Sequence, residues 1–278
     1  MIKQRLITAV VLIAVIASLL FYLPSLYWLG FTCLMTAVGA WEWSGLFLKQ
    51  TPLAAWASVA FAIIITALAY LAMHTLAHNT LYGATVLMTL WGFCGIKRYS
   101  STQQRHQAGL HDPILSLLLS LWLLIPFLSA MNDIVAAKHG AWVLLYAMSI
   151  VWVNDSMAYA TGKLFGKHKL IPAVSPNKTW QGLIGGLFFA IAWGVLLGFF
   201  VVWPHMHYYW SYTLLVVLIT LSANVGDLLM SLLKRLASVK DTSNLLPGHG
   251  GVLDRIDSLL TAMPLFALGC NLLGLISH

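Results

Sequence analysis

Residues 234–257 carry seven charged side chains and one histidine, although charged residues make up only 8% of the 278-residue chain. Carboxylates such as that of Asp254 are hard oxygen ligands that suit Mg²⁺, which binds one or two of them together with water and substrate phosphates. Lysine and arginine pair with phosphate oxygens. The glycines within 247–251 permit positive φ angles and a close approach of the backbone to a ligand. Together, these residue types predict chemistry on a phosphate group with a divalent cation.

The spacing of the polar residues places several of them on one helical face. On a helix through residues 227–235, positions i, i+4, i+7 and i+8 lie on the same side. Those positions hold Asp227, Ser231, Lys234 and Arg235. Asp254 and Asp257 are three residues apart and can face one side at the start of the last helix. A simpler interpretation stays open, in which the two basic residues anchor the membrane topology and the last two acids stabilise a helix N-terminus.

A second candidate anion site lies at residues 175–179, Ser-Pro-Asn-Lys-Thr, just before another predicted helix. We expect a turn that leads into this helix, because a helix N-terminus offers unpaired N–H groups to an anion. Ser175, Lys178 and Thr179 are the candidates for phosphate contact. The alternative is a plain N-cap with a lysine that anchors the helix at the membrane surface.

The elements that must position these residues are membrane helices. The chain is 60% hydrophobic, with a mean hydropathy of +0.85, and a bilayer core needs about 20 apolar residues per helical span. We therefore predict an all-α, polytopic membrane protein with a single domain over residues 1–278 and a catalytic part at about 150–260. The nine predicted spans cover about 6–23, 25–47, 53–73, 79–96, 114–132, 141–161, 181–203, 210–233 and 257–276.

The formal net charge of +7 reflects membrane topology rather than nucleic-acid binding. With nine spans and a cytoplasmic N-terminus, fourteen of the fifteen lysines and arginines fall on the inner side, and only Lys138 falls outside. Such an excess is typical of cytoplasmic loops in membrane proteins. We therefore predict a protein of the bacterial inner membrane with a periplasmic C-terminus. The loops at 97–113, 162–180 and 234–256 would face the cytoplasm and carry the active site.

Three of the eight acidic residues lie inside predicted spans: Glu42, Asp155 and Asp227. Carboxylates in a bilayer are costly to bury and mark functional sites. Counted from the nearest inner lysine at 1.5 Å per residue, each lies roughly 10–12 Å below the cytoplasmic boundary. We expect all three at the floor of one water-filled cavity that opens to the cytoplasm. For Glu42, a structural or buried-pair role is the stronger alternative.

The stretch from Ser231 to Asp257 resembles the signature of the phosphatidate cytidylyltransferases, also called CDP-diacylglycerol synthases. We find no departure from that signature over its 27 positions. The matching residues are Ser231, Leu233, Lys234, Arg235, Lys240, Asp241, Ser243, Leu246, Pro247, His249, Gly250, Gly251, Val252, Asp254, Arg255, Ile256 and Asp257. The resemblance extends to residues 155–167, 175–182 and 40–43.

This resemblance implies an enzyme that joins CTP to phosphatidate, releases pyrophosphate and makes CDP-diacylglycerol. It also implies a homodimer and a requirement for Mg²⁺, with Asp227 and Asp254 as ligands and room for a second cation. The candidate catalytic residues are Asp227, Asp254, Lys240, Asp241, His249, Arg255 and Asp257. The candidate contacts to CTP phosphates are Ser175, Lys178, Thr179, Lys234, Arg235, Gly250 and Gly251.

Other functions stay open on the residues alone. An ion-coupled transporter also buries acids beside a cavity, although the sequence shows neither a repeat between its halves nor a pair of broken helices. A CDP-alcohol phosphotransferase would carry an Asp-rich run with an Ala-Arg pair, which the sequence lacks. Asn154 and Met157 stand where the resemblance leads us to expect smaller residues. A paralog that acts on a different lipid is therefore a further alternative.

Overall fold

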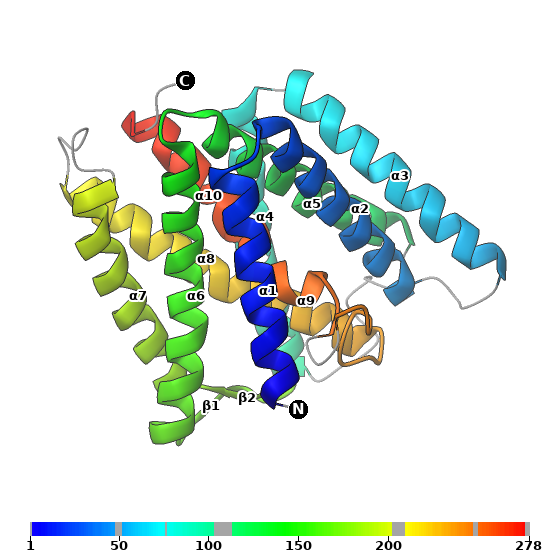
Figure 1. Cartoon of the computed structure of the whole chain (residues 1–278). Coiled ribbons are helices and arrows are strands. Elements are labelled where there is room, and N and C mark those ends of the chain that lie inside the picture. Colours follow the sequence, from blue (N-terminus) through cyan, green and yellow to red (C-terminus); the bar gives the residue numbers. More distant parts are fainter. Residues whose placement is uncertain are drawn as a thin grey trace.

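The computed structural model describes residues 2–47, 52–75, 77–102, 113–201, 209–246 and 250–275. Within these residues the chain forms a bundle of helices and one small sheet (Figure 1). The helices are α1 (Ile2–Phe21), α2 (Ser25–Phe47), α3 (Pro52–Thr75), α4 (His78–Thr102), α5 (Pro113–Ala136), α6 (Gly140–Phe165), α7 (Trp180–Val201), α8 (Tyr209–Leu236), α9 (Leu253–Ile256) and α10 (Leu259–Leu273). The strands are β1 (Lys169–Ile171) and β2 (Ser175–Thr179).

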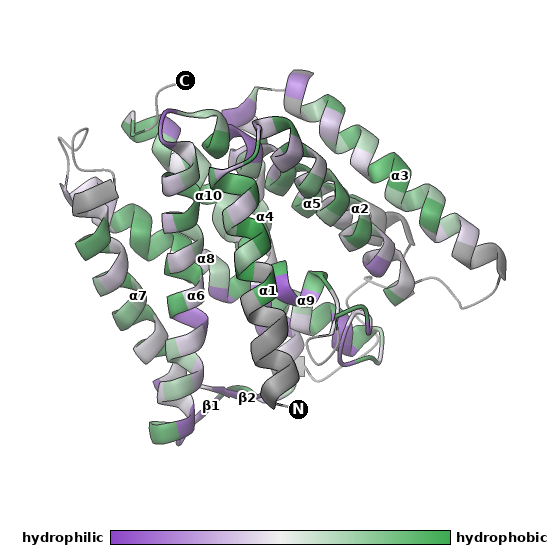
Figure 2. Ribbon diagram, in the orientation of Figure 1, coloured by the Kyte–Doolittle hydropathy of each residue, from purple (hydrophilic) through white to green (hydrophobic). Residues whose placement is uncertain are grey.

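Each of the nine predicted spans overlaps one of these helices, which confirms the all-α, membrane-type class. Among the described residues, four helical segments are long and apolar enough to cross a bilayer: Leu118–Ala136, Gly140–Phe165, Trp180–Gly198 and Tyr209–Leu236. Two shorter apolar segments, Trp56–Ala72 and Leu259–Leu273, accompany them. Figure 2 shows hydrophobic residues along the helices, whereas hydrophilic residues gather at the sheet and near α9. The count of nine crossings stays a prediction.

The start of α1 and the β-sheet lie at one end of the bundle, and the end of α10 lies at the other (Figure 1). An odd number of helices that run the length of the bundle produces this arrangement. The end with the sheet also contains the C-terminal ends of α6 and α8 and therefore the polar segments that follow them.

The prediction of a turn at residues 175–179 was wrong, because these residues form strand β2. It pairs antiparallel with β1, with Lys169 opposite Thr179 and Ile171 opposite Ser175. The turn instead lies before β2, where the Val174 amide donates to the Ile171 carbonyl at 3.1 Å. A strand is recognised in a sequence by the alternation of apolar and polar side chains. Strands of three and five residues in a polar segment are too short to show this alternation. The sheet holds β2 in an extended form that enters α7 directly.

The last predicted span, about 257–276, corresponds to α10, which begins at Leu259. The short helix α9 precedes it, and Asp257 and Ser258 between the two helices keep right-handed helical backbone angles. The Ser258 hydroxyl donates to Asp155 on α6 at 3.1 Å, which ties the start of α10 to the bundle.

Helices α6 and α7 pack closely because glycines of α7 face α6. A Cβ atom on Gly185 would lie 2.3 Å from the Thr161 hydroxyl oxygen, and one on Gly186 would lie 2.8 Å from the Asn154 carbonyl oxygen. A Cβ on Gly182 would lie 2.7 Å from the Ala158 carbonyl oxygen. Small residues allow helix backbones to approach in this way inside membranes. This contact sets the spacing of the two helices that form one wall of the site.

Candidate active site

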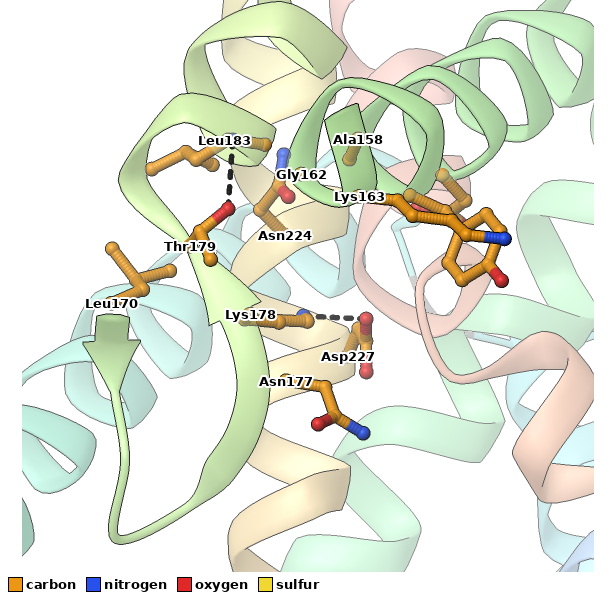
Figure 3. Close-up of a pocket in the computed structure, with 13 residues that line it drawn as sticks. Ala158, Gly162, Lys163, Leu170, Asn177, Lys178, Thr179, Leu183, Asn224 and Asp227 are labelled. Atoms are coloured by element: carbon orange, nitrogen blue, oxygen red, sulfur yellow. Dashed lines mark hydrogen bonds and ion pairs between the residues drawn. The ribbon is translucent and has the colours of Figure 1, made fainter. Parts of the chain in front are cut away.

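A cavity of about 480 Å³ lies between α6, β2, α7 and α8, close to the end of the bundle that carries the sheet (Figure 3). Both apolar and polar side chains line it, as expected for a small-molecule site. The lining residues are Asp155, Ala158, Tyr159, Gly162, Lys163, Leu170, Asn177, Lys178, Thr179, Gly182, Leu183, Asn224 and Asp227. Two of the predicted intramembrane acids, Asp155 and Asp227, are therefore brought together as expected.

Lys178 and Asp227 form an ion pair across this cavity. The ammonium of Lys178 on β2 lies 2.5 Å from Oδ2 of Asp227 on α8, and about a quarter of each side chain is exposed. Figure 3 shows Lys178 pointing from the strand toward Asp227. The extended form of β2 makes this possible, because alternate side chains of a strand point to opposite sides. The strand thus brings Lys178 into contact with Asp227, which lies within α8.

Asp155 is held by a chain of side-chain amides that the sequence analysis missed. The Asn224 amide donates to the Thr220 carbonyl at 2.8 Å and to Oδ1 of Asn154 at 3.1 Å. The Asn154 amide in turn donates to Oδ1 of Asp155 at 3.0 Å, while Ser258 donates to its other oxygen. Asn224 precedes Asp227 by three residues on α8, and this helical spacing was the available signal. The network fixes the Asp155 carboxylate at the cavity wall.

Lys234 and Asp254 form a second ion pair, which lies deeper in the protein. The Lys234 ammonium donates to Oδ1 of Asp254 at 2.6 Å, and their side chains are 12% and 2% exposed. Oδ2 of Asp254 accepts three further bonds, from the Thr242 amide and hydroxyl and from the Gly251 amide, at 2.8–3.0 Å. Burial raises the pKa of Asp254, but these bonds outweigh it and hold the pKa below its usual range. Asp254 is therefore an ionised group that ties α8 to the loop.

Glu42 lies apart from the cavity that Asp155 and Asp227 line, so the prediction of three acids on one cavity floor was wrong for Glu42. Its side chain is buried, and it accepts four hydrogen bonds from residues 242–243 and 252–253. The number of residues between an acid and the membrane boundary predicts only its depth. It does not predict toward which neighbouring helix the side chain points. The polar partners of Glu42 come from the loop after α8.

The structure does not support phosphate contact by the backbone of Gly250 and Gly251. The Gly250 amide donates to the Leu246 carbonyl at 3.1 Å, and the Gly251 amide donates to Asp254 at 2.9 Å. Gly250 does adopt the positive φ of 82° that the sequence suggested. A Cβ atom on Gly251 would lie 2.6 Å from both Glu42 carboxylate oxygens. The two glycines therefore shape the loop against buried acids.

Three other predicted phosphate contacts also have structural partners. The Thr179 hydroxyl accepts from the Gly182 amide at 3.1 Å, as an N-cap of α7 does. Arg235 donates from Nε to the Val174 carbonyl at 3.2 Å and thus ties α8 to the β-turn. Ser175 is the first residue of β2. For these residues the plain structural interpretation fits the geometry better than a ligand contact.

Of the remaining predicted residues, three lie at the surface, one lies outside the described part of the chain, and Asp257 is partly buried. Lys240, Asp241 and Arg255 are exposed, on either side of the loop that Asp254 and Glu42 hold. His249 lies outside the described residues. Asp257 lies at the end of α9, where the charges of Asp227, Asp155 and Lys234 act on it.

Carboxylates at the cavity and next to it offer oxygen ligands of the kind that a divalent cation takes. Asp155 and Asp227 line the cavity, Asp257 lies where the charges of both act on it, and Asp254 pairs with Lys234. Each predicted metal ligand, Asp227 and Asp254, directs one oxygen at a lysine ammonium and so already faces a positive charge. Within the described residues no group of three or more His, Cys, Asp or Glu is already arranged around one point. The donor set therefore suits Mg²⁺, which keeps several waters and takes few protein ligands.

Comparison with known proteins places the chain among lipid-modifying enzymes. The profile of the "Cytidylyltransferase family" matches residues 3–273. A phosphatidate cytidylyltransferase of Haemophilus influenzae is 33% identical over 284 residues, which cover 96% of this chain and 98% of that protein. The protein of the same name from Pseudomonas aeruginosa is 36% identical over 277 residues, covering 96% of each. One from Staphylococcus haemolyticus is 43% identical over 128 residues, 46% of this chain and 48% of that protein.

Proposed function

This chain belongs to the cytidylyltransferase family, and from that premise we propose that it is a membrane phosphatidate cytidylyltransferase of phospholipid biosynthesis. It transfers the cytidylyl group of CTP to phosphatidate, which gives CDP-diacylglycerol and pyrophosphate. The observation that carries this proposal is the similarity to two phosphatidate cytidylyltransferases over 96% of the chain. An ion-coupled transporter, a CDP-alcohol phosphotransferase and a paralog with another lipid substrate are not favoured by these relatives.

The reaction asks the protein for charge neutralisation and alignment. A phosphate oxygen of phosphatidate attacks the α-phosphorus of CTP, the bond between that phosphorus and the β-phosphate oxygen breaks, and pyrophosphate leaves. The attacking oxygen is already an anion, so no general base is required. Both substrates are polyanions, and catalysis of such transfers rests on positioning and electrostatic stabilisation. Lys178 at the cavity and the exposed Lys240 and Arg255 supply the positive charge.

Magnesium is the cofactor that the acidic groups would hold. Asp227 and Asp254 are the proposed ligands, with Asp257 and Asp241 as their supports and with enough acidic groups for a second cation. The Mg²⁺ would offset the negative charge of the two phosphate groups that react. Lys178 and Lys234 would then exchange their carboxylate partners for substrate phosphate oxygens.

Topology, location and assembly extend the proposal. We place the protein in the bacterial inner membrane with nine spans, its N-terminus and cavity at the cytoplasmic side, and its C-terminus in the periplasm. The distribution of lysine and arginine supports this orientation. CTP would reach the cavity from the cytosol and phosphatidate from the inner leaflet. The protein would act as a homodimer.

The direct test uses the purified protein in detergent with phosphatidate, Mg²⁺ and CTP labelled at its α-phosphate. We expect the label to enter the lipid extract as CDP-diacylglycerol, and we expect EDTA to stop the reaction until Mg²⁺ is restored. The Asp227→Asn variant should insert and fold but lose turnover. A wild-type protein that leaves all label in the aqueous phase would contradict the proposal.

The basic contacts have a matched control within the chain. Arg255→Ala and Lys240→Ala should each raise the KM for CTP or lower turnover, by about 1.5–3 kcal/mol for each charge-assisted bond that is lost. Lys138→Ala also removes an exposed charge, between α5 and α6, and should change neither constant. Unchanged constants in both loop variants would remove these residues from the nucleotide site.

A further inference from the structure

We propose that Glu42 is a positioning residue for the nucleotide: it closes the base of the loop at residues 242–253 and so fixes the groups that flank this loop. The inference rests on the proposed function, because it assumes that CTP is the ligand near the loop. Glu42 does not line the cavity and thus acts through other residues. It lies on α2, about 200 positions before its partners in the sequence.

The Glu42 carboxylate joins the two ends of the loop. Oε1 accepts from the Ser243 hydroxyl at 2.6 Å and from the Val252 amide at 2.8 Å. Oε2 accepts from the Thr242 hydroxyl at 3.0 Å and from the Leu253 amide at 2.7 Å. Each oxygen therefore binds one residue from the beginning of the loop and one from its end. The four bonds together hold the base of the loop closed.

The surroundings of Glu42 keep its carboxylate in this place. Glu42 is 2% exposed, and the neighbouring Trp43 is 1% exposed. One turn earlier on α2, a Cβ atom on Gly39 would lie 3.2 Å from the Leu253 side chain, so α2 and the start of α9 are in close contact. Asp254 ties the same region from the other side through Thr242 and Gly251. The base of the loop is thus held between two buried acids.

This closure sets the relative positions of charges that the sequence separates. Lys240 and Asp241 lie just before the first residue that Glu42 holds, and Arg255 lies two residues after the last. An open base would let these groups move independently, whereas the closed base fixes the chain next to each of them. Catalytic constellations need such support, because side chains displaced by about 1 Å lose much of their effect.

A carboxylate is required at this position, and an amide is a poor substitute. Two backbone N–H donors, from Val252 and Leu253, point at different oxygens of Glu42. Glutamine has one oxygen and one NH₂ group, so in either orientation its NH₂ would face one of these donors. The Glu42→Gln substitution conserves size and removes only the closure. It is the variant that tests the proposal.

The experiment compares Glu42→Gln with Asp133→Asn in the full-length protein in detergent. Asp133 is a matched control, because its carboxylate also pairs with two side chains, the buried Tyr82 and the partly exposed His78, but lies on α5 near the opposite end of the bundle. The measurements are the KM for CTP, the KM for phosphatidate, the unfolding temperature and the rate of trypsin cleavage after Lys240. The cleavage rate reports closure of the loop without any need for activity.

We expect Glu42→Gln to raise the KM for CTP at least tenfold, to change the KM for phosphatidate less than twofold and to speed cleavage after Lys240. Asp133→Asn should change neither the ratio of the two KM values nor the cleavage rate. Wild-type cleavage and a wild-type KM for CTP in Glu42→Gln would overturn the proposal, as would an equal change in both KM values. If Glu42→Gln does not fold, Ser243→Ala, which removes one of the four bonds, carries the same test with a KM increase of about threefold. Absence of cytidylyl transfer in the wild type would refute the proposed function, while the cleavage rates would still test the closure.

Discussion

Replacing Asp254 by asparagine perturbs a buried charge pair in a way that can be calculated from its contacts. The asparagine oxygen can take the place of Oδ2 and keep the bonds from Thr242 and Gly251. Its NH₂ group then faces the Lys234 ammonium, which loses its carboxylate partner at 2.6 Å and stays largely buried, at 12% exposure. The destabilisation should therefore come almost entirely from one unpaired charge.

The size of this effect follows from the cost of breaking a buried ion pair by removal of one partner, about 3–5 kcal/mol. For chains of about this size, each kcal/mol lowers the unfolding temperature by about 2–4 °C. Asp254→Asn should therefore unfold at least about 6 °C below the wild type. The Lys234→Met, Asp254→Asn double variant removes the unpaired charge and should regain most of that loss, because apolar replacements of buried pairs are often neutral.

The assay is thermal unfolding of the three purified proteins in one detergent without Mg²⁺, followed by turnover with saturating Mg²⁺. Both variants should be inactive, since Asp254 is a proposed metal ligand, so stability is the measurement that discriminates. The reasoning is refuted if Asp254→Asn unfolds at the wild-type temperature, or if the double variant is no more stable than the single one. Either result would mean that Lys234 finds another partner in the folded protein.

Three further predictions concern packing, capping and topology. Gly185→Ala should destabilise the protein by about 1–3 kcal/mol, because the new Cβ would lie 2.3 Å from the Thr161 hydroxyl oxygen. Gly83→Ala, which places its Cβ in open space, should leave the stability unchanged, and thermal unfolding of both variants measures the difference. Thr179→Ala should lower the stability by about 1 kcal/mol through the lost N-cap and leave the KM for CTP unchanged. A raised KM for CTP would instead indicate that Thr179 contacts the nucleotide. A reporter fused after His278 should be active only in the periplasm, and activity confined to the cytoplasm would contradict the nine-span topology.

The helices could be predicted from the sequence because each one is an apolar run of sufficient length. The same runs gave the depth of Asp155 and Asp227, since both lie a fixed number of residues from a lysine that follows them. Helical spacing placed Asp227 and Lys234 on one side of α8. These inferences depend on local sequence. The structure confirms the helices and brings Asp155 and Asp227 to one cavity, whereas their depth in the membrane stays a prediction.

Contacts between distant segments could not be predicted in the same way. The sequence predicts a similar depth in the membrane for Glu42 and Asp155, but their helices face different partners, and depth carries no information about the rotation of a helix about its axis. The ion pair between Lys178 and Asp227 depends on a hairpin with eight strand residues. This hairpin is too short for the alternation of apolar and polar side chains to be recognised in the sequence. The glycine loop was expected to bind phosphate because its composition fits, yet two buried acids occupy its surroundings instead.

The pairing of Glu42 with the loop also constrains how the protein is made. The amides of Val252 and Leu253 follow Glu42 by 210 and 211 residues, so at about 5–20 residues per second the ribosome needs roughly 10–40 s to supply them. During that interval the side chain lacks the partners that later surround it, and a lone carboxylate is costly in hydrocarbon. This group must therefore be hydrated or shielded by the insertion machinery until its partners are made. Residues 252 and 253 thus complete the surroundings of a side chain on α2 that is made more than 200 residues earlier.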